Sequence, residues 1–430
     1  MIAGDAIHIS GSSQSTPGDQ TAPMRETASA RKRLTGVLFG GVALGSTAYI
    51  AAVTIATLAV DEITGSAALA GMPGATATLG TAVGTSLLTR DVARRGRRPG
   101  LAAGYAAAVV GSALSILGLT GDSLPVLLIG MALLGLGNAS GHLARYAAAE
   151  MFPEDRKGRA LGTVVWAGTI GSVLGPALLQ PSGRLAVDLG RSELAGGFLV
   201  SFVFMGIALV LCIVGLRPDP ATLAIDRPEP TDQPPVGLGP AFRLPAVRVA
   251  LIAMTAGQVV MVMIMTSTPL HIHHHGSDLG IVGLVMSAHT LGMFALSPLT
   301  GRLTDRWGGY RVIMVGMFLL GLSALAAAYG PNDSTALLIV VLFALGYGWN
   351  LAFVAGSSLL TVGVGSEIRS RLQGRVDSLT WTAGALASVS SGVIYQASDY
   401  RAISLIGLLL LVVPVVVMLR NRGAPLAVGS

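Results

Sequence analysis

The chain contains twelve apolar runs, each long enough to cross a lipid bilayer as a helix. About 20 apolar residues span the hydrocarbon core of a bilayer. Backbone groups find no water there, so such runs must bond internally as helices. The runs are residues 34–60, 66–88, 101–120, 125–150, 160–181, 196–216, 248–270, 279–300, 312–330, 335–361, 376–398 and 402–419. The sequence therefore predicts an all-α membrane protein with twelve transmembrane helices.

The composition agrees with a membrane protein and argues against several soluble classes. Hydrophobic residues make up 52% of the chain and charged residues 12%, whereas a soluble domain is usually about 25% charged. The net charge of +6 lies in short basic clusters between apolar runs, so we expect no nucleic-acid partner. The single cysteine, Cys212, excludes an intrachain disulfide. No nucleophile–base pair is visible, so we expect neither enzyme activity nor a cofactor.

The polar segments divide the chain into two halves of six helices each. Residues 1–33 form a polar segment that we expect to be a disordered cytoplasmic tail. Residues 34–216 form the N-terminal half, and residues 248–420 the C-terminal half. The segment 217–247 between them is rich in proline and in charges of both signs, which is typical of a linker. Residues 421–430 form a second cytoplasmic tail.

The distribution of basic residues predicts the orientation of the protein in the membrane. If both termini and the linker are cytoplasmic, the outer loops contain only Arg184, Arg191 and Arg401, and Arg145 falls within a run. The other 24 of the 28 Lys and Arg residues (28 − 3 − 1) then lie on the inner side. Basic residues favour the cytoplasmic side of a membrane. We therefore expect a protein that spans the lipid bilayer of the plasma (inner) membrane, with both termini cytoplasmic. We also expect a monomer.

The two halves share a weak repeat. The segment Gly301–Arg311 reads GRLTDRWGGYR, and the matching place in the first half reads TRDVARRGRRPG. Two related halves of six helices are a transporter architecture, in which the substrate binds near the midplane. We therefore expect alternating access, with the two halves moving about a central site.

Over residues 34–420 the chain resembles the major facilitator superfamily. The resemblance rests on the loop after the eighth run, whose signature residues are Gly301, Asp305, Arg306, Gly308 and Arg311. It implies that these residues form a gating latch on the cytoplasmic side. The first-half copy departs from the pattern, with Ala93 at the signature Asp position and Asp91 as a possible substitute. The segment ending in Gly175-Pro176 resembles the antiporter motif, and plain helix packing is the alternative.

Methionine and histidine recur at helical spacing in the seventh and eighth runs. Met261 and Met265 are four residues apart, as are His289 and Met293. Thioethers select copper(I), and they carry no charge into the membrane. A histidine in the middle of a membrane helix indicates a functional site. The alternative is that these methionines fill gaps in the core.

These two motifs resemble those of the CcoA-like copper importers, a branch of the same superfamily. The resemblance implies copper as the substrate, held by Met261, Met265, His289 and Met293. The same branch includes riboflavin-type importers, so the resemblance does not fix the substrate. Four histidines follow on the predicted outer side, at His271, His273, His274 and His275. They form either a collector for metal ions or a solvated turn.

The fourth run contains the polar residues Asn138, His142, Arg145, Tyr146 and Glu150. Arg145 and Tyr146 are candidates for binding an anionic substrate or for proton coupling. Glu150 is interpreted as one half of an ion pair near the cytoplasmic end, and Arg145 is a candidate partner.

Copper import is the leading hypothesis, and two alternatives stay open. One is a small organic solute, moved by a riboflavin-type importer or by a drug or metabolite efflux antiporter. Its further candidate contacts are Trp349, Asn350 and Trp381. The other alternative is a signalling or scaffold protein with the transporter fold.

Overall fold

The computed structural model describes residues 21–223, 239–331, 334–360 and 366–420, and no strand occurs among them. The helices of the first part are α1 (Thr21–Thr64), η1 (Ala67–Leu69), α2 (Met72–Arg95), α3 (Arg97–Thr120), α4 (Leu124–Glu150), α5 (Glu154–Ala177), α6 (Leu179–Asp188), α7 (Ala195–Gly215) and η2 (Pro220–Leu223). Those of the second part are η3 (Ala241–Arg243), α8 (Pro245–His274), α9 (Leu279–Phe294), α10 (Ser297–Trp307), α11 (Gly309–Tyr329), α12 (Thr335–Leu359), α13 (Ser366–Ala397), α14 (Tyr400–Leu410) and α15 (Val412–Arg420).

Every predicted apolar run coincides with a helix or with a consecutive pair of helices. In the described part of the chain, nine helical segments are long and apolar enough to cross a membrane. The pair α5–α6, bent by 48°, makes a tenth. The remaining two runs are α2 and α13, which are less apolar and which contact each other. Because α2 and α13 pack against each other, each exposes less surface to lipid and therefore needs fewer apolar residues.

The first helix begins earlier than the sequence indicated. The tail was expected to reach residue 33, but α1 begins at Thr21 and runs through Arg31-Lys32-Arg33. The expectation was wrong because this polar segment consists largely of good helix formers, which extend a membrane helix into water. The Arg33 side chain also donates a hydrogen bond to the carbonyl oxygen of Arg217, which ties α1 to the start of the linker. Residues 1–20, 224–238 and 421–430 lie outside the described residues.

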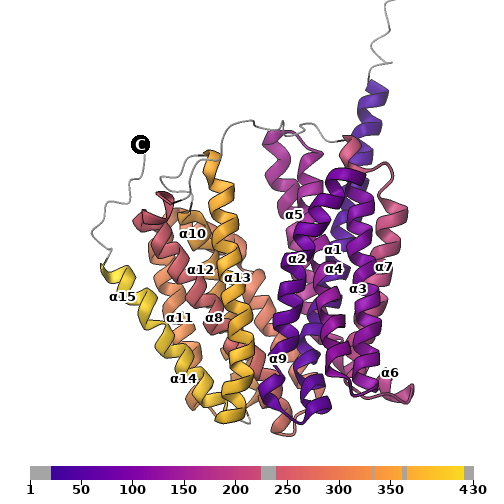
Figure 1. Ribbon diagram of the computed structural model, residues 1–430. Helices are drawn as coiled ribbons and strands as arrows, with labels where there is room; N and C mark the ends of the chain where they lie inside the picture. Colours follow the sequence, from indigo (N-terminus) through magenta and orange to yellow (C-terminus); the bar gives the residue numbers. More distant parts are fainter. Residues whose placement is uncertain (1–20, 224–238, 332–333, 361–365, 421–430) are drawn as a thin grey trace, which may run out of the picture.

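The helices form two bundles, α1–α7 and α8–α15, which stand side by side in Figure 1. Within the first bundle α4 packs against α2 and α3, and α1 packs against α5 and α7. Small residues permit these close approaches. A Cβ atom at Gly135 of α4, for example, would lie 2.2 Å from the carbonyl oxygen of Ala77 of α2.

The two bundles meet near one end of the molecule and diverge toward the other. We call the end at which α1 begins the upper face, as drawn in Figure 1, and the other end the lower face. The bundles are joined by contacts of α5 with α9, and of α2 and η1 with α13. The Ser388 hydroxyl donates to the Gly71 carbonyl oxygen at 2.9 Å, and Gln180 Nε2 donates to Asp278 Oδ2 at 3.4 Å. These contacts lie in the lower half of the molecule.

Candidate functional site

A polar stripe runs along α4 within its membrane span. Asn138, His142 and Arg145 are spaced by four and three residues, so they share one face of the helix. Asn138 Nδ2 donates to Thr81 Oγ1 of α2 at 3.3 Å and lies 3.4 Å from His142 Nε2. Tyr49 of α1 interacts with the same threonine. All five side chains are partly exposed.

Arg145 is the charged member of this stripe, and its charge is not neutralised by an ion pair. Its Nη2 donates to the hydroxyl of Tyr146 at 3.4 Å, and the guanidinium carbon lies 5.0 Å from the centroid of that ring. Its Nε atom is buried without a hydrogen-bond partner. No carboxylate in the described part of the chain forms an ion pair with it. A guanidinium inside a membrane protein is costly unless it meets a negative or hydrogen-bond-accepting group.

Glu150 takes part in an ion pair, as the sequence indicated, but its partner is Arg97 of α3. Arg97 Nε donates to Glu150 Oε2 at 3.0 Å, and the Nη2 atom also contacts Oε1. Arg145 was the candidate partner and is not used. Glu150 lies five residues beyond Arg145, so the two side chains point in different directions around the helix.

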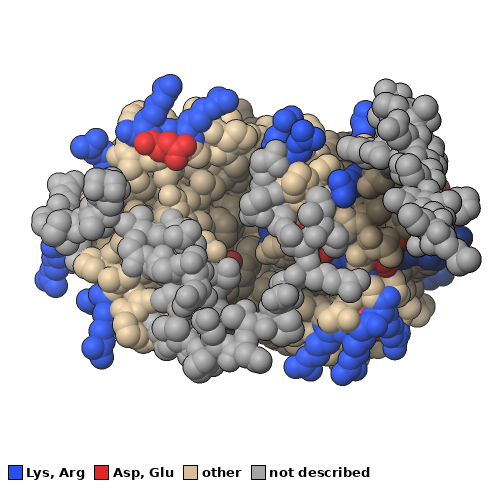
Figure 2. Space-filling view, turned by 90° about the horizontal axis from the view of Figure 1, so that it is seen from above, with Lys and Arg blue, Asp and Glu red and all other residues tan. Residues whose placement is uncertain are grey.

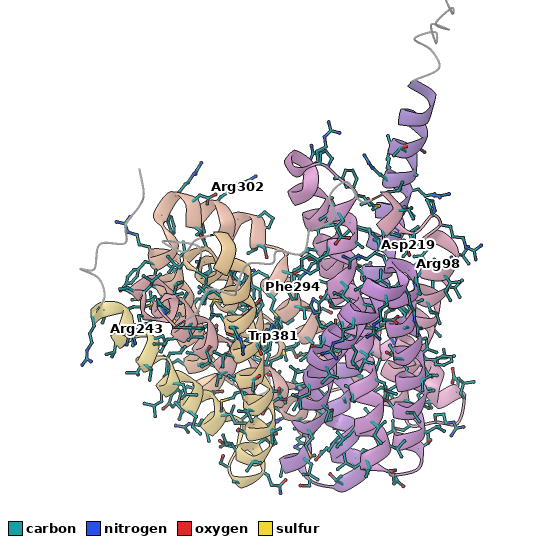
Figure 3. The ribbon with its side chains drawn as sticks, turned by 45° about the horizontal axis from the view of Figure 1, so that its top comes forward. Arg98, Asp219, Arg243, Phe294, Arg302 and Trp381 are labelled. Atoms are coloured by element: carbon teal, nitrogen blue, oxygen red, sulfur yellow. The ribbon has the colours of Figure 1, made fainter. Side chains whose placement is uncertain are left out.

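Asp219, which follows the last helix of the first bundle, was missed by the sequence reading. Its carboxylate accepts hydrogen bonds from the backbone nitrogens of Arg97 at 3.1 Å and Arg98 at 2.8 Å (Figure 3). It thereby satisfies N–H groups at the start of α3, where a negative charge is also favourable. The available signal was a carboxylate between two prolines, in the segment RPDP.

We expect Asp219→Ala to lower the free energy of unfolding by about 1 kcal/mol, because it removes a helix cap. The measurement is the thermal stability of the purified protein. Asp91→Ala is the matched control, since Asp91 makes only an exposed 3.1 Å pair with Arg95 on its own helix, worth roughly 0.3–0.5 kcal/mol. Equal losses in the two variants would contradict the capping role.

A second stripe, on α13, faces the first bundle. Asp377, Trp381, Ser388 and Gly392 recur at helical spacing along this helix. Ser388 and Gly392 touch the first bundle, since a Cβ atom at Gly392 would lie 2.7 Å from the carbonyl oxygen of Ala67. Trp381 lies nearer the upper face on the same stripe and is 41% exposed (Figure 3). Arg145 interacts electrostatically with Asp377 without forming an ion pair, so a gap separates the two charges.

Two of the candidate contacts for an organic solute are part of the core. The Trp349 ring stacks on Phe353 with centroids 4.9 Å apart, and its Nε1 donates to Gln258 Oε1 at 2.7 Å. Asn350 Nδ2 donates to the carbonyl oxygen of Met293 and to Ser297 Oγ, both at 2.7 Å. Both side chains are buried and have their hydrogen bonds satisfied. The expectation that they line the cavity was therefore wrong, whereas Trp381 is accessible.

None of the contacts among the described residues joins the predicted copper ligands of α8, Met261 and Met265, to those of α9, His289 and Met293. These two helices touch only slightly, and α9 packs chiefly on α12 and α5. His289 Nδ1 is 2.9 Å from the Leu342 carbonyl oxygen of α12, and Met293 packs beside Gly346 of the same helix. His289 Nε2 is buried without a hydrogen-bond partner. Met261 is buried and Met265 is half-buried, both on α8.

The four histidines at the end of α8 make local contacts. His271 is buried and stacks on Tyr400 with centroids 4.4 Å apart, and His275 Nδ1 lies 2.7 Å from the His271 carbonyl oxygen. His274 Nε2 pairs with Asp61 Oδ2 of α1 at 2.8 Å, which joins the two bundles at the lower face. His273 is exposed. Among the described residues, no three His, Cys, Asp or Glu side chains are grouped to hold a metal ion.

The sequence model of the Major Facilitator Superfamily matches residues 37–281 and, a second time, residues 249–429. The chain belongs to this superfamily. It is a multi-pass membrane transporter and not an enzyme. The signature loop of this major facilitator protein lies in α10 and at the start of α11, near the upper face in Figure 1.

Two curated relatives extend over most of this major facilitator chain. The uncharacterized MFS-type transporter YdeG of Bacillus subtilis is 35% identical over 396 residues, which is 90% of each chain. The riboflavin transporter RfnT of Brucella anthropi is 25% identical over 408 residues, 93% of this chain and 99% of the relative. The solved structure of a D-xylose–proton symporter matches with a TM-score of 0.65 at 19% identity, over 89% of this chain and 96% of that one. This last similarity shows the fold alone.

The signature residues are not engaged as a latch in this conformation of the facilitator. Asp305, Arg306, Gly308 and Arg311 are exposed and Gly301 is half-exposed. Neither Asp305 nor Arg306 forms an ion pair with another described residue.

The two weaker motifs of the facilitator have structural explanations. Asp91 pairs with Arg95 of its own helix. The carboxylate at the start of α3 is that of Asp219. On α5, a Cβ atom at Gly171 would lie 2.4 Å from the Ala43 carbonyl oxygen, and one at Gly175 2.6 Å from that of Thr47. These contacts support the helix-packing interpretation of the glycines.

Proposed function

We propose that this transporter moves a small organic solute by alternating access through the space between the two bundles. The upper face is cytoplasmic in this proposal, and the conformation described above is open toward the cytoplasm. Figure 2 shows Lys and Arg side chains around the rim of the upper face in both bundles, which agrees with the preference of basic residues for the cytoplasmic side. A conformation that is open toward the cytoplasm is part of the transport cycle of importers and of exporters, so it does not fix the direction of transport.

The observation that carries the proposal is the Arg145 guanidinium, which has no ion-pair partner among the described residues and whose Nε is buried without a hydrogen bond. A permanent positive charge there repels a metal cation, and it attracts a solute with a negative or hydrogen-bond-accepting group. Asn138 and Tyr146 add further hydrogen-bonding groups next to it. The name of the relative RfnT, a riboflavin transporter, also points to an organic solute.

Copper import is the narrower hypothesis from the sequence, and the observed contacts do not favour it. His289 Nδ1 already contacts the Leu342 carbonyl oxygen, and the helix with Met261 and Met265 touches α9 only slightly. Of the histidines at the end of α8, His274 pairs with Asp61 and His271 stacks on Tyr400. Copper therefore enters the experiment as the competing substrate.

The test is uptake into proteoliposomes that contain the purified full-length transporter. Riboflavin, a panel of small organic acids and copper(I) are compared, together with the thermal stabilisation that each produces. A ligand at 100 times its Kd stabilises the folded protein by about 2.7 kcal/mol. We expect an organic solute to be transported and to stabilise the protein, equally in the wild type and in Met265→Leu. Uptake of copper(I) alone, lost in Met265→Leu and His289→Gln, would overturn the proposal.

A further inference from the structure

We infer that the transported solute is an aromatic monoanion, held with its acid group on Arg145 of α4 and its ring on Trp381 of α13. The inference rests on the proposed function and specifies its substrate class. Two features carry it: a cation on one bundle that has no ion-pair partner among the described residues, and an accessible indole on the other bundle that contacts no described aromatic ring.

The negative charge of the solute follows from the surroundings of Arg145. A guanidinium offers five N–H donors in a fork that matches a carboxylate or phosphate. Here one nitrogen reaches the Tyr146 hydroxyl and Nε has no partner. The neighbouring polar side chains are Asn138, His142 and Thr81, and none of them carries a carboxylate. A carboxylate on the solute would give Arg145 the ion-pair partner that no described residue supplies.

The aromatic character follows from a comparison of two tryptophans in the second bundle. Trp349 is 4% exposed, is stacked on Phe353 and is hydrogen-bonded through its indole nitrogen. Trp381 is 41% exposed and contacts no aromatic ring among the described residues. Its helix stripe turns it toward the first bundle, because Ser388 and Gly392 on that stripe touch α2 and η1. A solute ring stacked on Trp381 would make the kind of aromatic contact that Phe353 makes with Trp349.

An ionised Asp377 disfavours a solute that carries more than one negative charge. Asp377 precedes Trp381 by one helical turn and interacts electrostatically with Arg145 across the gap. A monoanion on Arg145 leaves a net charge of −1 in the group formed by Arg145, Asp377 and the solute. A dianion leaves −2, which a site with low dielectric strongly disfavours. Removal of the Asp377 charge therefore strengthens the binding of an anion.

The experiment measures binding by calorimetry on the purified full-length transporter, with three probes of similar size. Benzoate has both the ring and the charge, benzamide has the ring without the charge, and cyclohexanecarboxylate has the charge without the aromatic ring. We expect benzoate to bind more tightly than either of the others. Arg145→Gln is expected to weaken benzoate binding roughly 10- to 100-fold, as for a lost charge-assisted hydrogen bond.

Substitutions at two further positions test the ring and the charge limit. Trp381→Leu is expected to weaken benzoate roughly three- to tenfold, and Trp381→Phe to retain most of the affinity. Asp377→Asn is expected to strengthen benzoate binding. The matched controls are Arg401→Gln, whose guanidinium lies over Tyr329 at 4.5 Å, and Trp166→Leu, an exposed tryptophan of α5. Both controls are expected to bind benzoate like the wild type.

The wild-type comparison decides the inference even if a variant fails to fold. The inference is overturned if benzamide or cyclohexanecarboxylate binds as tightly as benzoate, or if benzoate does not bind. Binding and uptake of an uncharged organic solute, unchanged in Arg145→Gln, overturns the inference but leaves the proposed function intact. Uptake of copper(I) alone overturns both.

Discussion

Gly71→Ala is expected to hold the transporter with its lower face open and to reduce transport at least tenfold. A Cβ atom at Gly71 would lie 1.7 Å from the carbonyl oxygen of Ser388 and 2.4 Å from its carbonyl carbon. Both are backbone atoms of α13, which cannot move aside cheaply. Gly71 has φ −79°, which alanine adopts freely, so the effect comes from the contact between the bundles.

The substitution acts on one conformation more than on the other. Overpacking costs typically 1–3 kcal/mol, which corresponds to roughly a 5- to 150-fold change in an equilibrium between two states. When α2 and α13 separate at the lower face, the added methyl group has room. The closed lower face therefore loses population, and the transport cycle, which needs both states, slows.

Cysteine labelling measures this shift, because Cys212 is the only cysteine and is buried. Gly141 lies on the polar stripe of α4 and has open space around its Cβ position, so Gly141→Cys serves as the reporter. A membrane-impermeant maleimide added at the lower face is expected to label it faster when Gly71→Ala is also present. Gly206→Ala, at a position with open space, is the control. Equal labelling in both backgrounds would show that close packing at Gly71 does not control the closure.

The second large effect is expected where α9 meets α5. Pro176 has no N–H group, so it leaves the carbonyl oxygen of Ser172, four residues earlier, without its helical partner. The hydroxyl of Thr290 donates to that oxygen from the other bundle at 2.8 Å. Ser287 donates to the next carbonyl oxygen, that of Val173, at 2.9 Å. The hydrogen bond missing because of the proline is thus replaced across the interface of the two bundles.

We expect Thr290→Val to destabilise the closed lower face by about 1–3 kcal/mol, because it leaves a buried carbonyl oxygen unsatisfied. Thr290→Ser keeps a hydroxyl and is expected to behave like the wild type. Pro176→Ala restores an N–H group to α5, so Thr290→Val is expected to cost less in that background. The labelling rate of Gly141→Cys measures all of these variants, and the double-mutant cycle isolates the coupling. An equal cost of Thr290→Val in both backgrounds would refute the connection between Thr290 and Pro176.

The sequence predicted the helical architecture and the family, because both depend on local properties. A run of about 20 apolar residues must form a helix in a bilayer, wherever its neighbours lie. The signature loop from Gly301 to Arg311 is contiguous, so its residues are recognisable without a fold. Polar side chains within the apolar runs likewise marked Arg145 and His289 as exceptional. The comparisons with known proteins confirm the superfamily and do not support copper as the substrate.

The partner of each polar side chain was decided by tertiary structure alone. Glu150 pairs with Arg97, and Asp219 caps α3 from more than a hundred residues away. His289 and Met293 share a face of α9, as their spacing of four residues predicts. The spacing does not show that this face packs against α12, where His289 contacts the Leu342 carbonyl oxygen. Spacing fixes which residues share a side of a helix, whereas the rotation of that helix in the bundle depends on the packing of all its neighbours. For this reason the sequence identifies a transporter, whereas only the tertiary structure shows that the stripe of α13 with Asp377 and Trp381 faces the bundle that contains Arg145.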